Sequence, residues 1–303
     1  VLLLTELKHT FTEFAQRMKN DEMITLAKFL AISGIILPML PHKNLIPDIN
    51  LTPYSIWLAT VVVSGISYLS YLLKRYVFHE SGVLVSGIIG GLYSSTATIS
   101  VLARKSRKAS EQEANEYVAA MLLAVSMMFL RFMILILIFS REIFTSIYPY
   151  LLIMSVVAAV VAWFIHSRHR RSKDMADESE DEDSSNPLEF KVALIFATLF
   201  VVFTVLTHYT LVYAGTGGLN LLSFVSGLSD ITPFILNLLQ NTGSVAVLVV
   251  VACSMQAIIS NILVNMFYAL FFAGKGSKLR PWILGGFGTV IGVNLVLLLF
   301  FYL

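Results

Sequence analysis

The chain has little cysteine and little charge. Its 303 residues contain a single cysteine, Cys253, which excludes an internal disulfide framework and a cysteine cluster around a metal. Charged residues make up 13% of the chain and the net charge is +2, so we expect no nucleic-acid partner. Nucleotide-binding glycine fingerprints and the HExxH and GxSxG signatures are also missing. These absences predict that the protein is not an enzyme and has no cofactor.

Hydrophobic residues, in contrast, make up 57% of the chain, and the mean hydropathy is +0.79. The hydrocarbon core of a bilayer takes about 20 helical residues to cross. The stretches are too continuous for the alternation of a membrane barrel, and lipid cannot satisfy an open strand edge. The sequence therefore predicts an all-α polytopic bundle in contact with the lipid bilayer. Nine apolar stretches could form its helices: 23–40, 54–73, 81–103, 115–140, 146–166, 188–213, 217–240, 244–273 and 281–303.

The positions of Lys and Arg indicate how these stretches cross, because such residues accumulate in short cytoplasmic loops. Three cations lie in or beside apolar runs and are left aside. If all nine stretches span, the remaining cations divide nine against nine between the two sides. If 81–103 and 217–240 instead return to the side they came from, sixteen lie inside and only Lys43 and Arg141 lie outside. We therefore predict seven spans plus two re-entrant or broken segments, with nine spans as the alternative.

An internal repeat links these two segments. The stretch "IIGGLYSSTATISVL" at 88–102 aligns without gaps on "FVSGLSDITPFILNL" at 224–238. One apolar helix precedes each motif and two follow it, which gives repeats at 54–166 and 188–303. If each repeat crosses the bilayer three times, the two copies are inverted. Inverted repeats that meet at broken helices are typical of secondary transporters.

The remaining segments complete the predicted organisation. Residues 1–22 contain a short apolar run and an amphipathic charged segment without a signal-cleavage site, and are expected to be a connector. Because the chain starts at Val1, we expect that an upstream part is missing. Residues 23–53 are expected to form the first transmembrane helix and its loop. The tract "DMADESEDEDSS" within 167–187 predicts a charged cytoplasmic linker.

The two motifs hold residues suited to a turn at membrane depth, where non-helical backbone must be buried in protein or line a watery cavity. Gly91 and Gly227 permit a tight conformation, and Pro233 favours a break. Exposed half-helix N-termini favour an anion, and exposed carbonyls favour a cation. Close packing of small residues between helices is the alternative explanation. The polar groups that could serve the freed backbone or a ligand are Ser94, Ser95, Thr96, Ser229, Asp230 and Thr232.

Two ionisable residues are predicted to lie at membrane depth. Arg131 falls in the middle of 115–140, and Asp230 falls at the turn of the second motif. Charge at this depth is costly and usually functional. The alternatives are that the two residues pair with each other, or that Arg131 binds carbonyls of a re-entrant loop. In the second repeat, the region that corresponds to Arg131 has uncharged polar groups, among them Gln256 and Asn261. This difference between the repeats suits a site in which one repeat holds a charged substrate group and the other holds a coupling ion.

Several segments carry a resemblance to a known family: "FLAISGIILPMLP", "GGLYSSTATISVLARKS", "NPLEFKVALIFATLF", "SGLSDITPFILNL" and "SNILVNMFYALFF". From about residue 20, the chain resembles the integral membrane domain of unknown function that follows an MgtC/SapB-type domain in many bacterial proteins. The resemblance implies an MgtC/SapB-like domain upstream, a bacterial inner (cytoplasmic) membrane location, and an Asp at the position of Asp230. The architecture is also similar, more loosely, to ion-coupled transporters with inverted re-entrant hairpins.

Together these features predict a secondary transporter or channel for a small ion or solute. We expect an anionic substrate group near Arg131 and a coupling Na⁺ or H⁺ near Asp230, and a homo-oligomer is possible. The alternative is a non-transporting membrane anchor or sensor that serves the MgtC/SapB-like domain in magnesium adaptation. Divalent cation transport is a third reading, with Asp230 as the candidate metal ligand, although Mg²⁺ is commonly held by carboxylates and waters and only one carboxylate is available at this depth.

Overall fold

The computed structural model describes residues 20–47, 49–78, 82–107, 109, 111–167, 190–240, 245–274 and 279–302. Most of the predicted connector and linker lie outside these ranges. The described residues form helices and no strand; the only bridge among them joins Ile46 and Ile49. The helices are α2 (Asn20–Met39), α3 (Pro53–Leu72), α4 (Val83–Lys105), α5 (Glu111–Phe139), α6 (Arg141–Ser167), α7 (Phe190–Ser226), α8 (Ile231–Gln240), α9 (Val247–Ala273) and α10 (Arg280–Tyr302), with a short π-helix, η1 (Leu73–Val77), after α3.

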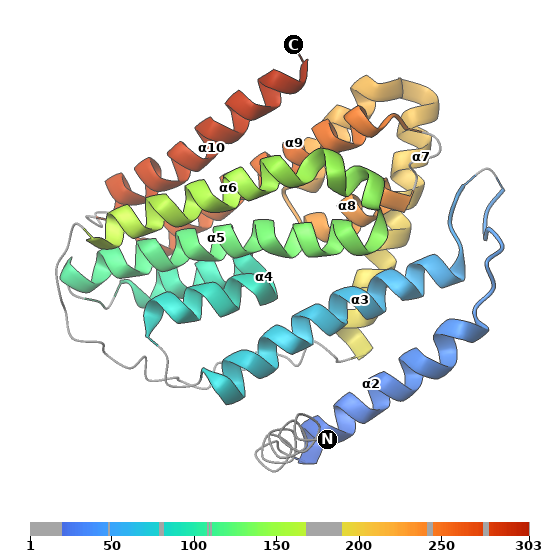
Figure 1. Ribbon diagram of the computed structural model, residues 1–303, viewed down its shortest axis with the longest axis horizontal. Helices are drawn as coiled ribbons and strands as arrows, with labels where there is room; N and C mark the ends of the chain where they lie inside the picture. The colour runs from blue at the N-terminus through green and yellow to red at the C-terminus, as the bar shows by residue number, and fades with distance from the viewer. Residues whose placement is uncertain are drawn as a thin grey trace, which may run out of the picture.

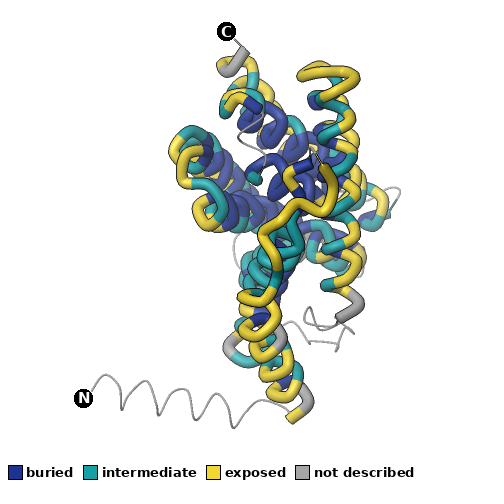
Figure 2. The backbone as a smooth tube through the Cα atoms, turned by 90° about the vertical axis from the view of Figure 1, so that its right-hand side faces the viewer, coloured by how far each residue is buried: buried dark blue, intermediate teal, exposed yellow. Residues whose placement is uncertain are grey.

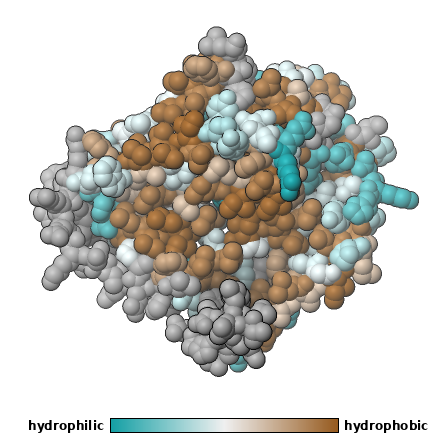
Figure 3. Space-filling view, viewed as in Figure 1, coloured by the Kyte–Doolittle hydropathy of each residue, from teal (hydrophilic) through white to brown (hydrophobic). Residues whose placement is uncertain are grey.

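The helices have the length and surface of membrane spans. Eight of them are long and apolar enough to cross a bilayer, and only α8, with ten residues, is too short. Large apolar side chains point outward from the bundle, including Trp163 at 69% exposure and Phe300 at 75%. Apolar side chains cover most of the face seen in Figure 3. The protein is therefore a multi-pass, all-α membrane protein, as the sequence predicts.

The helices are arranged around α5 (Figure 1). This helix packs against α4 on one side and α6 on the other, and α10 lies along α6 and α9. Many of its apolar side chains, such as Phe129 and Leu135, are fully buried, whereas Ile134, Leu137 and Ile138 near its end are exposed. Figure 2 shows the buried residues gathered in the middle of the bundle, while the outer helices alternate between buried and exposed sides. The deepest part of the core thus lies beside the two predicted motifs.

Helices α2 and α3 form an outer pair. Thr52 caps α3 with a reciprocal capping box and Pro53 occupies its first turn, which fixes where the helix starts. At the other end of the pair, Arg75 forms an ion pair with Glu22 at 3.1 Å, and the Tyr71 hydroxyl donates to Glu22 at 2.8 Å. These contacts join the start of α2 to the end of α3 and η1.

The first motif lies on α4, which is interrupted in its middle. Ser94 has an extended backbone, with φ of −159° and ψ of 108°. A Cβ placed on Gly90 would lie 2.5 Å from Oγ1 of Thr98, although residues eight apart in a straight helix are about 12 Å apart. The two halves of α4 therefore fold back on each other, as expected of a re-entrant segment.

The second motif is divided between α7 and α8. Gly215 interrupts α7 with φ of +59°, a conformation that favours glycine, and a second interruption at 227–230 separates α7 from α8. The stretch 217–240 is therefore not one helix. Pro233 lies in the first turn of α8, where its missing N–H is not needed for the helix, and the break precedes it at 227–230.

The ends of α4 and α9 meet at one end of the bundle. The guanidinium of Arg104, at the end of α4, lies 4.6 Å from the ring centre of Phe272, near the end of α9. Arg107 lies beside Gly274, with Nε 3.3 Å from the position of a Cβ there. Nine spans would place the ends of α4 and α9 on opposite sides of the membrane. The contacts therefore favour the arrangement with two re-entrant segments.

This arrangement predicts the sidedness of α4. In a Cys253→Ala background, Phe78→Cys and Ala109→Cys should both react with a membrane-impermeant thiol reagent from the cytoplasmic side only. Leu45 lies in the loop between α2 and α3 and is 56% exposed. Leu45→Cys should react from the outside only. Reaction of residues 78 and 109 from opposite sides would restore the nine-span arrangement.

Candidate functional site

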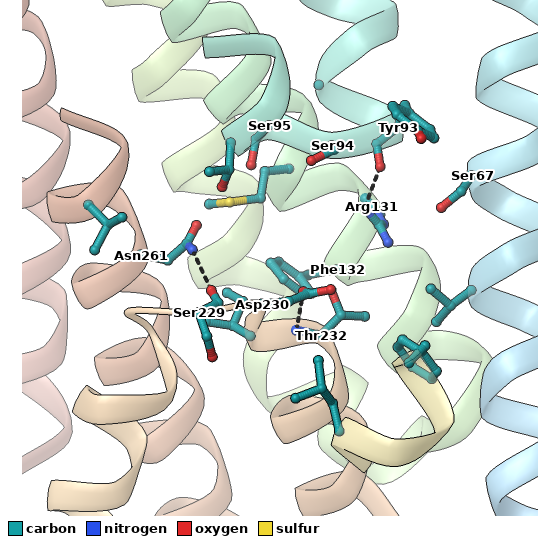
Figure 4. Close-up of a pocket in the computed structure, with 18 of the residues that line it drawn as sticks. Ser67, Tyr93, Ser94, Ser95, Arg131, Phe132, Ser229, Asp230, Thr232 and Asn261 are labelled. Atoms are coloured by element: carbon teal, nitrogen blue, oxygen red, sulfur yellow. Dashed lines mark hydrogen bonds between the residues drawn. The ribbon is translucent and has the colours of Figure 1, made fainter. Parts of the chain in front are cut away.

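The two interrupted segments face a common cavity of about 370 Å³ (Figure 4). Residues of the first break lie along one side of it, and residues of the second break lie along the other. The helices α3, α5, α7 and α9 close the remaining sides. The polar lining residues are Ser64, Ser67, Tyr93, Ser94, Ser95, Thr96, Arg131, Ser229, Asp230, Thr232, Asn261 and Tyr268.

At the first break, α5 supplies the partner of the freed backbone. Arg131 donates from a terminal guanidinium nitrogen to the carbonyl of Tyr93 at 2.8 Å. The next half-helix is capped by the Ser94 hydroxyl, which accepts from the N–H of Ala97 at 3.3 Å. A carbonyl at the end of one half-helix and an N-terminus at the start of the next are thus presented together at the cavity.

The second break has the same organisation with different residues. The Asp230 carboxylate accepts from the N–H of Thr232 at 2.9 Å and caps α8. Asn261 on α9 donates to the carbonyls of Gly227 and Ser229 at 3.3 and 3.4 Å. In the ungapped alignment, Asp230 matches the cap Ser94, and Ser229 matches Tyr93. Equivalent carbonyls are therefore bound by a cation in the first repeat and by an amide in the second.

Both motif glycines permit close approach of two helices. A Cβ on Gly91 would lie 2.5 Å from the Cα of Ala124 on α5. A Cβ on Gly227 would lie 2.5 Å from the carbonyl oxygen of Ala257 and 2.4 Å from the Cβ of Ser260 on α9. The glycines bring each break against the helix that satisfies its carbonyls.

The two charged residues do not neutralise each other by contact. Arg131 and Asp230 make no ion pair within 4.0 Å, although Asp230 is close enough for its charge to act on the guanidinium. Nε of Arg131 is buried and has no hydrogen-bond partner. One oxygen of Asp230 caps α8, and the residue is exposed at the cavity. Of the alternatives for Arg131, binding to a loop carbonyl is observed, and direct pairing with Asp230 is not.

Nine of the eleven residues predicted from sequence line the cavity. Gly227 contributes its carbonyl to Asn261 but does not line it, and Gln256 does not line it either. Gln256 lies on α9 more than one turn before Asn261, so the helix carries it away from the breaks.

Among the lining residues that the sequence did not predict are Tyr93 and Tyr268 and two groups from α3 and α7. Ser64 and Ser67 come from α3, where small residues three apart marked one side of an otherwise apolar helix. The apolar wall comes from the start of α7, and nothing in its continuous apolar sequence distinguishes these positions. The wall residues are Val192, Ile195, Phe196 and Leu199.

A metal site has little support in this part of the chain. The described residues contain no group of three or more His, Cys, Asp or Glu that could hold a metal ion. Asp230 is the only carboxylate among the lining residues. Its role as a metal ligand stays a prediction.

Comparison with known proteins places the chain in a family. Residues 61–273 match the family described as a domain of unknown function, DUF4010, and the chain belongs to this family. A protein of Aquifex aeolicus (strain VF5), described as uncharacterized, is 27% identical over 221 residues, which cover 72% of this chain and 94% of that protein. No solved structure matches. The predicted resemblance is thus confirmed for the domain of unknown function, and its association with an MgtC/SapB-type domain stays a prediction.

Proposed function

We propose that this member of the DUF4010 family is a secondary transporter or channel for a small ion or solute in the bacterial inner membrane. The observation that supports it is the cavity itself, in which the polar groups of two broken helices and two opposite charges face the same space. Charged side chains within membrane spans are costly and mark substrate or ion pathways. If Arg131 and Asp230 served only to stabilise the bundle, direct contact between them would neutralise both charges.

The proposed mechanism uses the two repeats as inverted halves. The N-terminal ends of the second half of α4 and of α8 present backbone N–H groups and partial positive charge at the cavity. Bound substrate would lie between these ends, and rocking of one repeat against the other would open the cavity to alternate sides. A coupling Na⁺ or H⁺ would act near Asp230.

The alternative is a membrane anchor or sensor that serves an MgtC/SapB-like domain. In that case the polar residues only pack helices, and the space between the breaks stays dry. Transport of a divalent cation has weaker support, because the cavity offers a single carboxylate and an opposing guanidinium.

Water in the cavity distinguishes transport from anchoring. In a Cys253→Ala background, Ser95→Cys at the cavity should react with a water-soluble thiol reagent, because the reactive thiolate forms only where water reaches it. Ser126→Cys is a matched control, because Ser95 is 7% exposed and Ser126 is 4% exposed. Ser126, however, lies between α5 and α6 in contact with Ser155 and not at the cavity. It should not react. An inert Ser95→Cys would argue for the anchor.

A further inference from the structure

We propose that the substrate is a small zwitterion of the α-amino acid type, with its carboxylate at Arg131 and its ammonium group at Asp230. This inference rests on the proposed function and adds the chemical class of the substrate. It is carried by two charges of opposite sign that line one cavity without touching each other.

The charge balance of the cavity favours such a ligand. With Arg131 positive and Asp230 negative, the lining charges sum to zero. A simple anion would satisfy Arg131 but lie near the carboxylate of Asp230, and a simple cation would meet the reverse conflict. Burial of an unpaired charge is expensive, whereas a ligand with both charges supplies a partner for each and keeps the site neutral.

Each charged residue has a free group for its end of the ligand. Arg131 lines the cavity, and one terminal nitrogen of its guanidinium binds the Tyr93 carbonyl, which leaves the other terminal nitrogen for a ligand carboxylate. Charge-assisted bonds from a guanidinium to a carboxylate are among the strong ones. At Asp230, one carboxylate oxygen caps α8, which leaves the second oxygen for an ammonium group. The partial positive N-terminus at Ser95 adds to the anionic end.

The rest of the cavity suits a small organic molecule better than a bare ion. Its volume, about 370 Å³, lies within the roughly 300–1,000 Å³ of small-molecule pockets. An apolar wall from α7, with Ile195 and Phe196, faces the polar breaks. Such a wall gives an apolar side chain a place to lie and offers nothing to a hydrated ion.

The test compares amino acids with their singly charged derivatives. Purified full-length protein in detergent is heated in the presence of L-alanine, L-serine or L-leucine, of each N-acetyl derivative, and of each methyl ester. We expect at least one free amino acid to raise the melting temperature, and its N-acetyl and ester forms to have no effect at the same concentration. A shift from the N-acetyl form equal to that of the amino acid would overturn the proposal in favour of an anion site, and the same from the ester would indicate a cation site.

Asp230→Asn gives the sharpest variant, because Asn is as good a helix cap as Asp and the start of α8 should survive. We expect it to weaken binding of the free amino acid at least tenfold and to let the N-acetyl derivative bind as well as the amino acid. Glu142→Gln, which removes an exposed carboxylate in the first turn of α6, is the control and should change neither.

The outcomes separate this inference from the proposed function. If Ser95→Cys is water-accessible and none of the amino acids produces a shift, the zwitterion proposal fails while a transport cavity stands. If Ser95→Cys is inert, the transport proposal fails first. Equal binding of the amino acid to wild type and Asp230→Asn would also overturn the role given to Asp230.

Discussion

Replacement of Gly91 or Gly227 by alanine is expected to destabilise the protein by about 1–3 kcal/mol or more, the cost of overpacking a tight contact. At both positions the new methyl group would meet backbone atoms of a neighbouring helix about 2.5 Å away. Backbone cannot rotate aside as the end of a flexible side chain can. Relief therefore requires the break to move away from α5 or α9.

Such a movement also separates each break from the side chain that binds its carbonyls, Arg131 or Asn261. The measurement is the melting temperature of each variant in detergent. Gly288→Ala on α10 is the control, because nothing lies within 4 Å of its Cβ position and the residue is exposed. It should be neutral or slightly stabilising, since alanine favours helix over glycine by up to about 1 kcal/mol. Gly91→Ala with the stability of Gly288→Ala would show that the close approach is not required.

Arg131→Gln is expected to have the largest effect of any single change at the cavity. It removes the charged donor of the Tyr93 carbonyl, and a hydrogen bond from a charged group contributes about 1.5–3 kcal/mol. It also leaves Asp230 without the nearby positive charge. Binding of the substrate carboxylate should be lost together with stability. Asp230→Asn should cost much less stability, because the cap of α8 is kept.

The double variant separates a ligand site from a structural ion pair. Because Arg131 and Asp230 make no ion pair, the double variant should recover little of the stability lost in Arg131→Gln. If the two residues served only to neutralise each other, removing both would recover most of the loss caused by removing one. Melting temperatures of the two single variants and the double variant, with and without amino acid, provide the comparison. Recovery in the double variant, with no ligand effect lost in either single variant, would contradict the proposed site.

Much of the architecture follows from the sequence alone. The long apolar stretches require helices, because lipid leaves backbone groups no partner outside a helix or a closed barrel. The repeated motif located both breaks, because helix interruption depends on local residues and both copies carry Gly-Leu with a Thr four residues after the Leu. The uneven distribution of cations favoured two re-entrant segments, and the contact between Arg104 and Phe272 agrees with it.

Tertiary structure alone decided how the site is assembled. The reversal of α4 at Ser94 became visible only through the contact of Gly90 with Thr98. Which carbonyl Arg131 binds, and that it does not touch Asp230, depend on how α5 packs between α4 and α8. The sequence determines where residues lie along a helix. The direction in which a side chain points across the bundle is set by the packing of helices that are far apart in the chain. That packing brought Ser64, Ser67 and the apolar wall of α7 to the same cavity.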